Sequence, residues 1–277
     1  MSTEIVLMWT AVTIYTASTI LFVFGAVFKS EKVQTIGLWV ALAGLVPQSI
    51  AIGIRWAAVG HGPYLGFYEV ISSYALASVV ALGVISWMRP RLKVFGVILM
   101  PVAVLMLGGA MLAPKSPLAI SAKLASWWLT IHVTFAKLSY MSFIAAFVLA
   151  LLFLWRERIG EPKENSMLAR LPSQAVVDDL SFRFIGVGFI FLTIMIVSGA
   201  IWANESWGRY WGWDPIETWS LISWIVYAGY LHVRLTLGWQ GRRASWFAVI
   251  ALPVMLFTLI GVPLAYQSIH GAYLTGY

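Results

Sequence analysis

Residues 94–113 read VFGVILMPVAVLMLGGAMLA, an apolar run without a single charged side chain. A helix that crosses the hydrocarbon core of a bilayer needs about 20 apolar residues, so this run predicts a membrane-spanning helix. With seven similar runs it gives eight predicted spans, near 4–28, 36–54, 69–88, 94–113, 128–155, 183–202, 217–237 and 246–268. Lipid offers no partners to backbone N–H and C=O groups, so these spans must be helices.

The composition supports the same fold class. The 277 residues are 61% hydrophobic and only 10% charged, whereas soluble domains carry about 25% charged residues. We predict an all-α, polytopic transmembrane helical bundle that forms one integral membrane domain over residues 1–277. The chain starts Met-Ser-Thr-Glu, with no positive charge before the first apolar run. We therefore expect a retained helix rather than a cleaved signal peptide.

Positive charges predict the orientation, because short cytoplasmic loops are rich in Lys and Arg. The first, third, fifth and seventh loops with their margins hold 13 of the 18 Lys and Arg residues. We expect these loops in the cytoplasm, including the longest one at 156–182, and both termini outside. The net charge of +7 is spread over loops rather than clustered, which indicates a lipid bilayer and no nucleic acid as partner.

Six of the 15 Trp residues fall within residues 202–224. We place the loop at 203–217 outside the membrane, between the sixth and seventh predicted helices. Trp202, Trp219 and Trp224 fit an aromatic belt at the membrane interface. A belt does not explain Trp at 207, 211 and 213, which glycines separate within a polar loop. Large flat side chains spaced in this way favour a platform for a large, flat, apolar ligand.

The end of this loop also has a structural interpretation. Asp214 suits a helix N-cap, Pro215 suits the first helical position, and Glu217 completes a capping box. The pattern predicts that the seventh helix starts here. We expect capping to be the main role of Asp214 and Glu217, with ligand contact as the alternative.

The four histidines separate by depth. His132 and His270 lie near the outer ends of the fifth and eighth predicted helices, beside the Trp-rich loop. Two imidazoles at one level suit the axial positions of haem iron. Zinc usually takes three or four clustered ligands, often cysteines, and this chain has no Cys. His232 lies about 22 Å along the helix from Glu217, toward the cytoplasmic leaflet. His61, in a Gly-His-Gly-Pro loop, is a loop or partner residue rather than an axial ligand.

Haem carries two propionates, which need cations. Arg209 within the Trp-rich loop is the best candidate, because a guanidinium pairs with a carboxylate through two hydrogen bonds. Other cations on the same side can pair with propionates or with lipid headgroups: Arg55, Lys115, Lys123 and Lys137.

These residues resemble a known family. The run from Trp207 through Asp214 to Trp219, continuing to His232, is similar to the WWD signature of the CcsA (ResC) family of System II cytochrome c maturation. A weaker similarity extends from Gly60 to Glu69. The resemblance implies that haem b reaches the outer face and is attached to apocytochrome c at Cys-x-x-Cys-His, together with a CcsB (ResB) partner. It makes the chain a subunit of a cytochrome c synthase, or haem lyase.

In that scheme His132 and His270 ligate the haem iron, and His232 marks the site where haem enters. The family more often has Lys where this chain has Ile216. The membrane is then the bacterial plasma membrane or the plastid thylakoid membrane, with the active face outside. Other readings stay open: a System I haem-delivery protein of the CcmC type, a b-type electron-transfer cytochrome, and a transporter whose Trp residues are only anchors.

Overall fold

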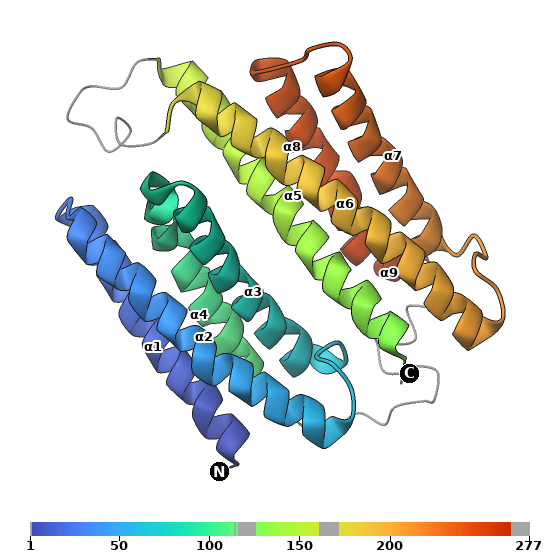
Figure 1. The fold of residues 1–277 in the computed structure, drawn as a ribbon, viewed down its shortest axis with the longest axis horizontal. Coiled ribbons are helices and arrows are strands. Elements are labelled where there is room, and N and C mark those ends of the chain that lie inside the picture. The colour runs from blue at the N-terminus through green and yellow to red at the C-terminus, as the bar shows by residue number, and fades with distance from the viewer. Residues whose placement is uncertain (1, 114, 116–125, 161–171, 267–277) are drawn as a thin grey trace. The chain divides into compact units, whose positions relative to one another are not determined.

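The computed structural model describes residues 2–113, 115, 126–160 and 172–266. The described residues form helices and no strands, which confirms the predicted all-α class (Figure 1). The elements are α1 Thr3–Val27, α2 Glu31–Val59, α3 Gly66–Met88, η1 Pro90–Phe95, α4 Gly96–Leu112, α5 Trp127–Ile159, α6 Gln174–Trp207, α7 Pro215–Leu235, α8 Arg242–Leu256, η4 Phe257–Gly261 and α9 Val262–Ala265. The chain divides into two compact units, Met1–Ala119 and Ile120–Tyr277.

Seven of the described helices are long and apolar enough to cross a membrane, so the chain is an integral membrane protein. Each of the eight predicted runs lies mainly on helices, with residues 267–268 of the last run outside the described residues. One of these helices, α7, does not belong to the seven. It has 21 residues, long enough to cross the hydrocarbon core. Trp, Tyr, Ser and His occupy many of its positions and lower its hydropathy.

Two predicted loops are shorter than expected. The loop placed at 156–182 is reduced from both sides, since α5 continues to Ile159 and α6 starts at Gln174. The loop placed at 203–217 covers only 208–214, because α6 continues to Trp207 and α7 starts at Pro215. The physical reason is common to both. Hydropathy marks the part of a helix that lies in lipid, whereas a helix continues into water until a cap ends it.

In the first unit, α1 packs on α2 and α4, and α3 packs on α4 and α2. A buried hydrogen-bond chain joins three of these helices: the Tyr15 hydroxyl donates to Gln48 Oε1 at 2.6 Å, and Gln48 Nε2 donates to the Ser72 carbonyl at 2.8 Å. Close approach of α1 and α2 depends on Gly44, where a Cβ atom would lie 2.4 Å from the Tyr15 ring.

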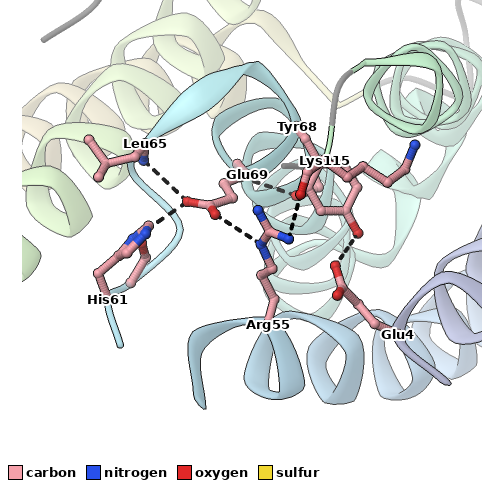
Figure 2. Close-up of polar contacts among 9 residues, drawn as sticks. Glu4, Arg55, His61, Leu65, Tyr68, Glu69 and Lys115 are labelled. Atoms are coloured by element: carbon pink, nitrogen blue, oxygen red, sulfur yellow. Dashed lines mark hydrogen bonds and ion pairs between the residues drawn. The ribbon is translucent and has the colours of Figure 1, made fainter. Parts of the chain in front are cut away.

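A polar cluster holds the end of this unit where α2 turns into α3 (Figure 2). Glu69 is its centre: its carboxylate accepts from Arg55 Nε at 3.0 Å and from the Leu65 backbone N–H at 3.3 Å. His61 Nδ1 lies 3.6 Å from the same carboxylate and 2.8 Å from the Gly62 carbonyl. Arg55 Nη1 also donates to the Lys115 carbonyl. His61, only 3% exposed, is therefore an internal part of this turn.

In the second unit, α5 and α6 pack along most of their length, and α8 and α7 complete the bundle. Its core is rich in aromatic residues, including a close stack of Phe143 on Tyr227. Gly188 lets α6 approach α5, because a Cβ atom there would lie 2.8 Å from Phe143. The Ser139 hydroxyl donates to the Gly188 carbonyl at 3.0 Å. This closely packed α5–α6 pair carries His132, and α6 ends at the Trp-rich loop.

Candidate functional site

Two caps define the Trp-rich loop, residues 208–214. Gly208, at φ 73°, ends α6 in the left-handed conformation that glycine adopts without strain. Asp214 starts α7: its side chain accepts from the Ile216 N–H at 3.0 Å. The Glu217 carboxylate accepts from the backbone N–H groups of Asp214, at 3.2 Å, and Gly212, at 2.8 Å. This confirms the predicted capping box with Pro215 in the first turn, and Glu217 holds the loop closed as well.

The tryptophans of the loop and of the last turns of α6 form two edge-to-face pairs rather than one shelf. Trp207 contacts Trp202 with ring centroids 4.8 Å apart, and Trp211 contacts Trp213 at 5.8 Å. Trp213 is 69% exposed and has a φ of 58°, a left-handed conformation that is unusual outside glycine. Backbone strain of this kind costs about 1–3 kcal/mol and is concentrated at functional sites.

Trp202 differs from the sequence interpretation. It is 2% exposed, so it is a core residue and not part of an interfacial belt. Its ring stacks beside the His132 imidazole, with centroids 6.4 Å apart and planes inclined by 24°. Trp219 packs on Phe257 at 4.6 Å, and the Trp224 indole donates to the Thr193 hydroxyl at 2.9 Å. All three contribute to packing within the second unit.

Arg209 lies over the backbone of the loop. The guanidinium occupies the space that a Cβ atom on Gly212 would take, so a side chain there would move this flexible group away from the backbone. Arg209 is exposed, and the described residues give it no ion pair. Its guanidinium is thus placed to bind an anionic group that approaches the loop.

The other predicted cations have different surroundings. Arg55 is bound to Glu69, and Lys115 Nζ donates to the Met111 and Ala113 carbonyls near the end of α4. Lys137 is buried within α5 at 9% exposure. Lys123 lies outside the described residues.

His132 lies in the second turn of α5, as the sequence predicted. Its Nδ1 is 2.8 Å from the Met195 carbonyl on α6. The imidazole rests on Gly199, where a Cβ atom would approach Nδ1 to 2.6 Å. The histidine is therefore bound across the α5–α6 interface rather than rotating at a helix surface.

A cavity of about 140 Å³ opens beside His132. It lies between α5, α6, the start of α7 and the segment η4, and it brings together residues far apart in the sequence. His132, Tyr140, Trp211 and Glu217 line it, with small side chains such as Ala136 and Ala200 between them. Ile216 also lines it.

The segment η4 supplies one wall of the cavity through a π-helical turn, Phe257–Gly261. Thr258 and Leu259 face the cavity. The Thr258 hydroxyl lies 3.1 Å from that of Ser223 and donates to the Trp219 carbonyl at 3.2 Å. π-helical turns in α-helices are frequent at functional sites. Tyr140, Met195 and Thr258 carry no local sequence pattern that distinguishes them from core residues, so their place in the cavity wall could not be predicted.

His232 lies far from this cavity, in the last turn of α7, as predicted. It is exposed, and its described polar contact is a 3.4 Å approach to the Thr236 hydroxyl. Arg234, two positions along, points inward and binds Asp178 of α6 at 2.6 Å. Residues two apart lie on nearly opposite sides of a helix, so the Arg234–Asp178 pair turns His232 outward. His270 lies outside the described residues.

Comparisons with known proteins agree with this architecture. A sequence profile described as cytochrome C assembly protein matches residues 64–270. The chain is 37% identical over 276 residues to the cytochrome c biogenesis protein CcsA of Parasynechococcus marenigrum (strain WH8102), covering 89% of each chain. It is 39% identical over 228 residues to that of Chlamydomonas reinhardtii, covering 78% of this chain and 62% of the relative.

Among solved structures, the cytochrome c heme lyase CcmF shares the fold with a TM-score of 0.62 and 18% identity. The match covers the whole of this chain and 49% of CcmF, so the chain spans about half the length of that protein.

Proposed function

This chain belongs to the cytochrome c assembly protein family, and we propose that it binds haem b beside the Trp-rich loop and presents it for covalent attachment to apocytochrome c. A role in cytochrome c maturation follows from the family. The observation that supports the haem site is the meeting of His132 and Trp211 at one cavity. An imidazole, an aromatic wall and small apolar side chains are the surroundings that haem requires.

The size of the cavity suggests how haem is held. Pockets that enclose drug-sized ligands measure about 300–1,000 Å³, which exceeds the 140 Å³ beside His132. The cavity therefore takes one edge of the macrocycle, and the rest lies against the loop. The exposed ring of Trp213 offers a contact face there. The Arg209 guanidinium is placed to bind a haem propionate. The Glu217 carboxylate lies in the cavity wall and would repel a propionate there, because like charges disfavour one another.

The chemistry at this site is mainly one of positioning. Each apocytochrome thiol adds across a haem vinyl group: the S–H bond breaks, a C–S bond forms, and the proton goes to the other vinyl carbon. The addition involves no net oxidation. Holding the vinyl edge and the thiols in register supplies the acceleration. The chain has no Cys, so it offers no thiol that could form a mixed disulfide with the apocytochrome thiols.

We assign the second axial position to His270, on the strength of the family resemblance. His232 serves as the site where haem enters, and its exposure on α7 supports a ligand contributed by a CcsB-type partner. The pair acts as a haem lyase in the bacterial plasma membrane or the thylakoid membrane, with the Trp-rich loop on the outer or lumenal face.

The test is spectroscopic. The chain is co-expressed with a CcsB-type partner, purified in mild detergent, and its oxidised and reduced absorption spectra are recorded. We expect a bis-imidazole spectrum that is lost or shifted in His132→Ala and in His270→Ala. The exposed Thr134→Ala on the same helix is the matched control. A complex without haem, or spectra indifferent to both histidine substitutions, would refute the ligand assignment.

A second assay separates attachment from electron transfer. The purified complex is incubated with reduced apocytochrome c, and covalent haem is measured on denaturing gels. Transfer of haem to the apoprotein supports the proposal. A stable haem that never transfers indicates a b-type electron-transfer cytochrome, and a chain that folds without haem indicates a transporter.

A further inference from the structure

We propose that Gly199 and the Met195 carbonyl, both on α6, form a seat that determines which nitrogen of His132 binds haem iron. Gly199 lies in the wall of the cavity beside His132, and we assign it a positioning role because its effect on iron binding is exerted through the imidazole. The inference rests on the proposed function, in which His132 is an axial ligand. No sequence motif includes either residue, and neither belongs to the Trp-rich loop.

The seat is defined by close approach. The His132 imidazole extends from α5 onto α6, where Nδ1 is 2.8 Å from the Met195 carbonyl oxygen. A Cβ atom at position 199 would lie 2.6 Å from Nδ1 and 2.8 Å from Cε1. Ordinary contacts of a Cβ atom begin near 3.4 Å. Any side chain at 199 therefore displaces the ring by most of an ångström, which breaks the hydrogen bond to Met195.

Helical propensity does not account for this glycine. Gly199 lies inside α6, which continues to Trp207, and glycine is among the poorest residues for a helix interior. A second glycine of the same helix, Gly186, has nothing within 4 Å of the place a Cβ atom would take. Of these two positions on α6, only position 199 must lack a side chain, because the imidazole occupies the space that a Cβ atom would take.

The hydrogen bond has a chemical consequence. When Nδ1–H donates to a backbone carbonyl, the neutral imidazole carries its lone pair on Nε2, so Nε2 is the atom that binds a metal. His132 also lines the cavity beside the loop. The Met195 carbonyl accepts from the Ser198 hydroxyl as well, at 3.1 Å. The seat thus fixes tautomer and ring orientation before haem arrives.

The first experiment compares Gly199→Ala with Gly186→Ala in the complex with the partner. Loss of such an outer hydrogen bond typically costs about 10- to 100-fold in metal affinity. We expect haem retention to fall by that factor in Gly199→Ala, with a shifted reduction potential and altered low-spin EPR signals. Gly186→Ala should match the wild type. If the wild-type complex retains haem and the two variants retain it equally well, the inference is wrong and the proposed function is unaffected.

The second experiment uses free imidazole and does not depend on the fold of Gly199→Ala. In His132→Gly the ring is absent, so added imidazole can occupy the seat and restore the haem spectrum. In His132→Gly/Gly199→Ala the methyl group at position 199 does not clash with a His132 ring, because that ring is absent. We therefore expect the double variant to fold, with the methyl group occupying the space that free imidazole would take. We expect imidazole to rescue the first variant at least tenfold better, in line with the hydrogen-bond effect. Equal rescue of both refutes the seat.

A third measurement needs no haem. In a chain labelled with ¹⁵N-histidine, the wild type and Gly186→Ala should show His132 protonated at Nδ1, assigned by its loss in His132→Ala. Gly199→Ala should lose that signal. If the wild type binds no haem but keeps this tautomer, the proposed function fails while the seat survives. If His132 is protonated at Nε2 instead, the seat fails.

Discussion

Replacing Asp178 by alanine should destabilise the second unit more than any other carboxylate substitution on α6. Asp178 and Arg234 are nearly enclosed, with side-chain exposures of 11% and 9%. Two hydrogen bonds join them, at 2.6 and 3.1 Å, and Asp178 also accepts from the Gly241 N–H at 3.0 Å. Among the described residues, the substitution leaves the buried guanidinium with the Trp239 carbonyl and the Phe182 ring as its remaining contacts. Breaking a buried pair in this way costs about 3–5 kcal/mol.

The neighbouring residue provides the control. Asp179 pairs with Arg183 one helical turn away at 2.8 Å, but these side chains are 42% and 59% exposed. An exposed i,i+4 pair contributes about 0.3–0.5 kcal/mol. Asp179→Ala should therefore cost roughly a tenth as much as Asp178→Ala, although both remove one aspartate from the same turn.

The assay is reversible unfolding of the purified chain in mixed micelles, with the free energy of unfolding determined for both single variants. A third variant replaces Asp178 and Arg234 by leucine together, which removes both charges and should recover most of the lost stability. The reasoning fails if Asp178→Ala and Asp179→Ala lie within about 0.5 kcal/mol of each other. It also fails if the double variant is as unstable as Asp178→Ala.

Three further predictions use the same unfolding assay or haem retention. Gly44→Ala should cost about 1–3 kcal/mol by overpacking, since its Cβ atom would lie 2.4 Å from the Tyr15 ring. A Cβ atom at Gly53 on the same helix meets nothing within 4 Å, so Gly53→Ala should be neutral or stabilising. Equal free energies of unfolding for the two variants would contradict this prediction. Trp213→Gly should relieve about 1 kcal/mol of backbone strain yet weaken haem retention, and unchanged retention would exclude Trp213 from the binding face. Asp214→Ala should cost about 1 kcal/mol through loss of the N-cap, and an unaltered unfolding curve would show that the cap bond contributes nothing.

The amino-acid sequence alone was sufficient for the properties that depend on local pattern. Long apolar runs predicted membrane-spanning helices, and the order of Asp214, Pro215 and Glu217 predicted the capping box. His132 and His232 fell near the predicted ends of their helices. Each of these inferences concerns residues within a few turns of one another, where helix geometry and hydropathy already determine the outcome.

Only the tertiary structure decided the features that depend on contacts between distant residues. His132 meets the Met195 carbonyl across 63 positions, and Arg234 meets Asp178 across 56. The burial of Trp202 beside His132 also depends on such a distant contact. The sequence had favoured a place for Trp202 in an interfacial belt. Helix periodicity states which face a residue occupies but not which helix will cover that face. That choice is made by packing, because a close approach such as the imidazole on Gly199 exists only when two particular helix surfaces fit together.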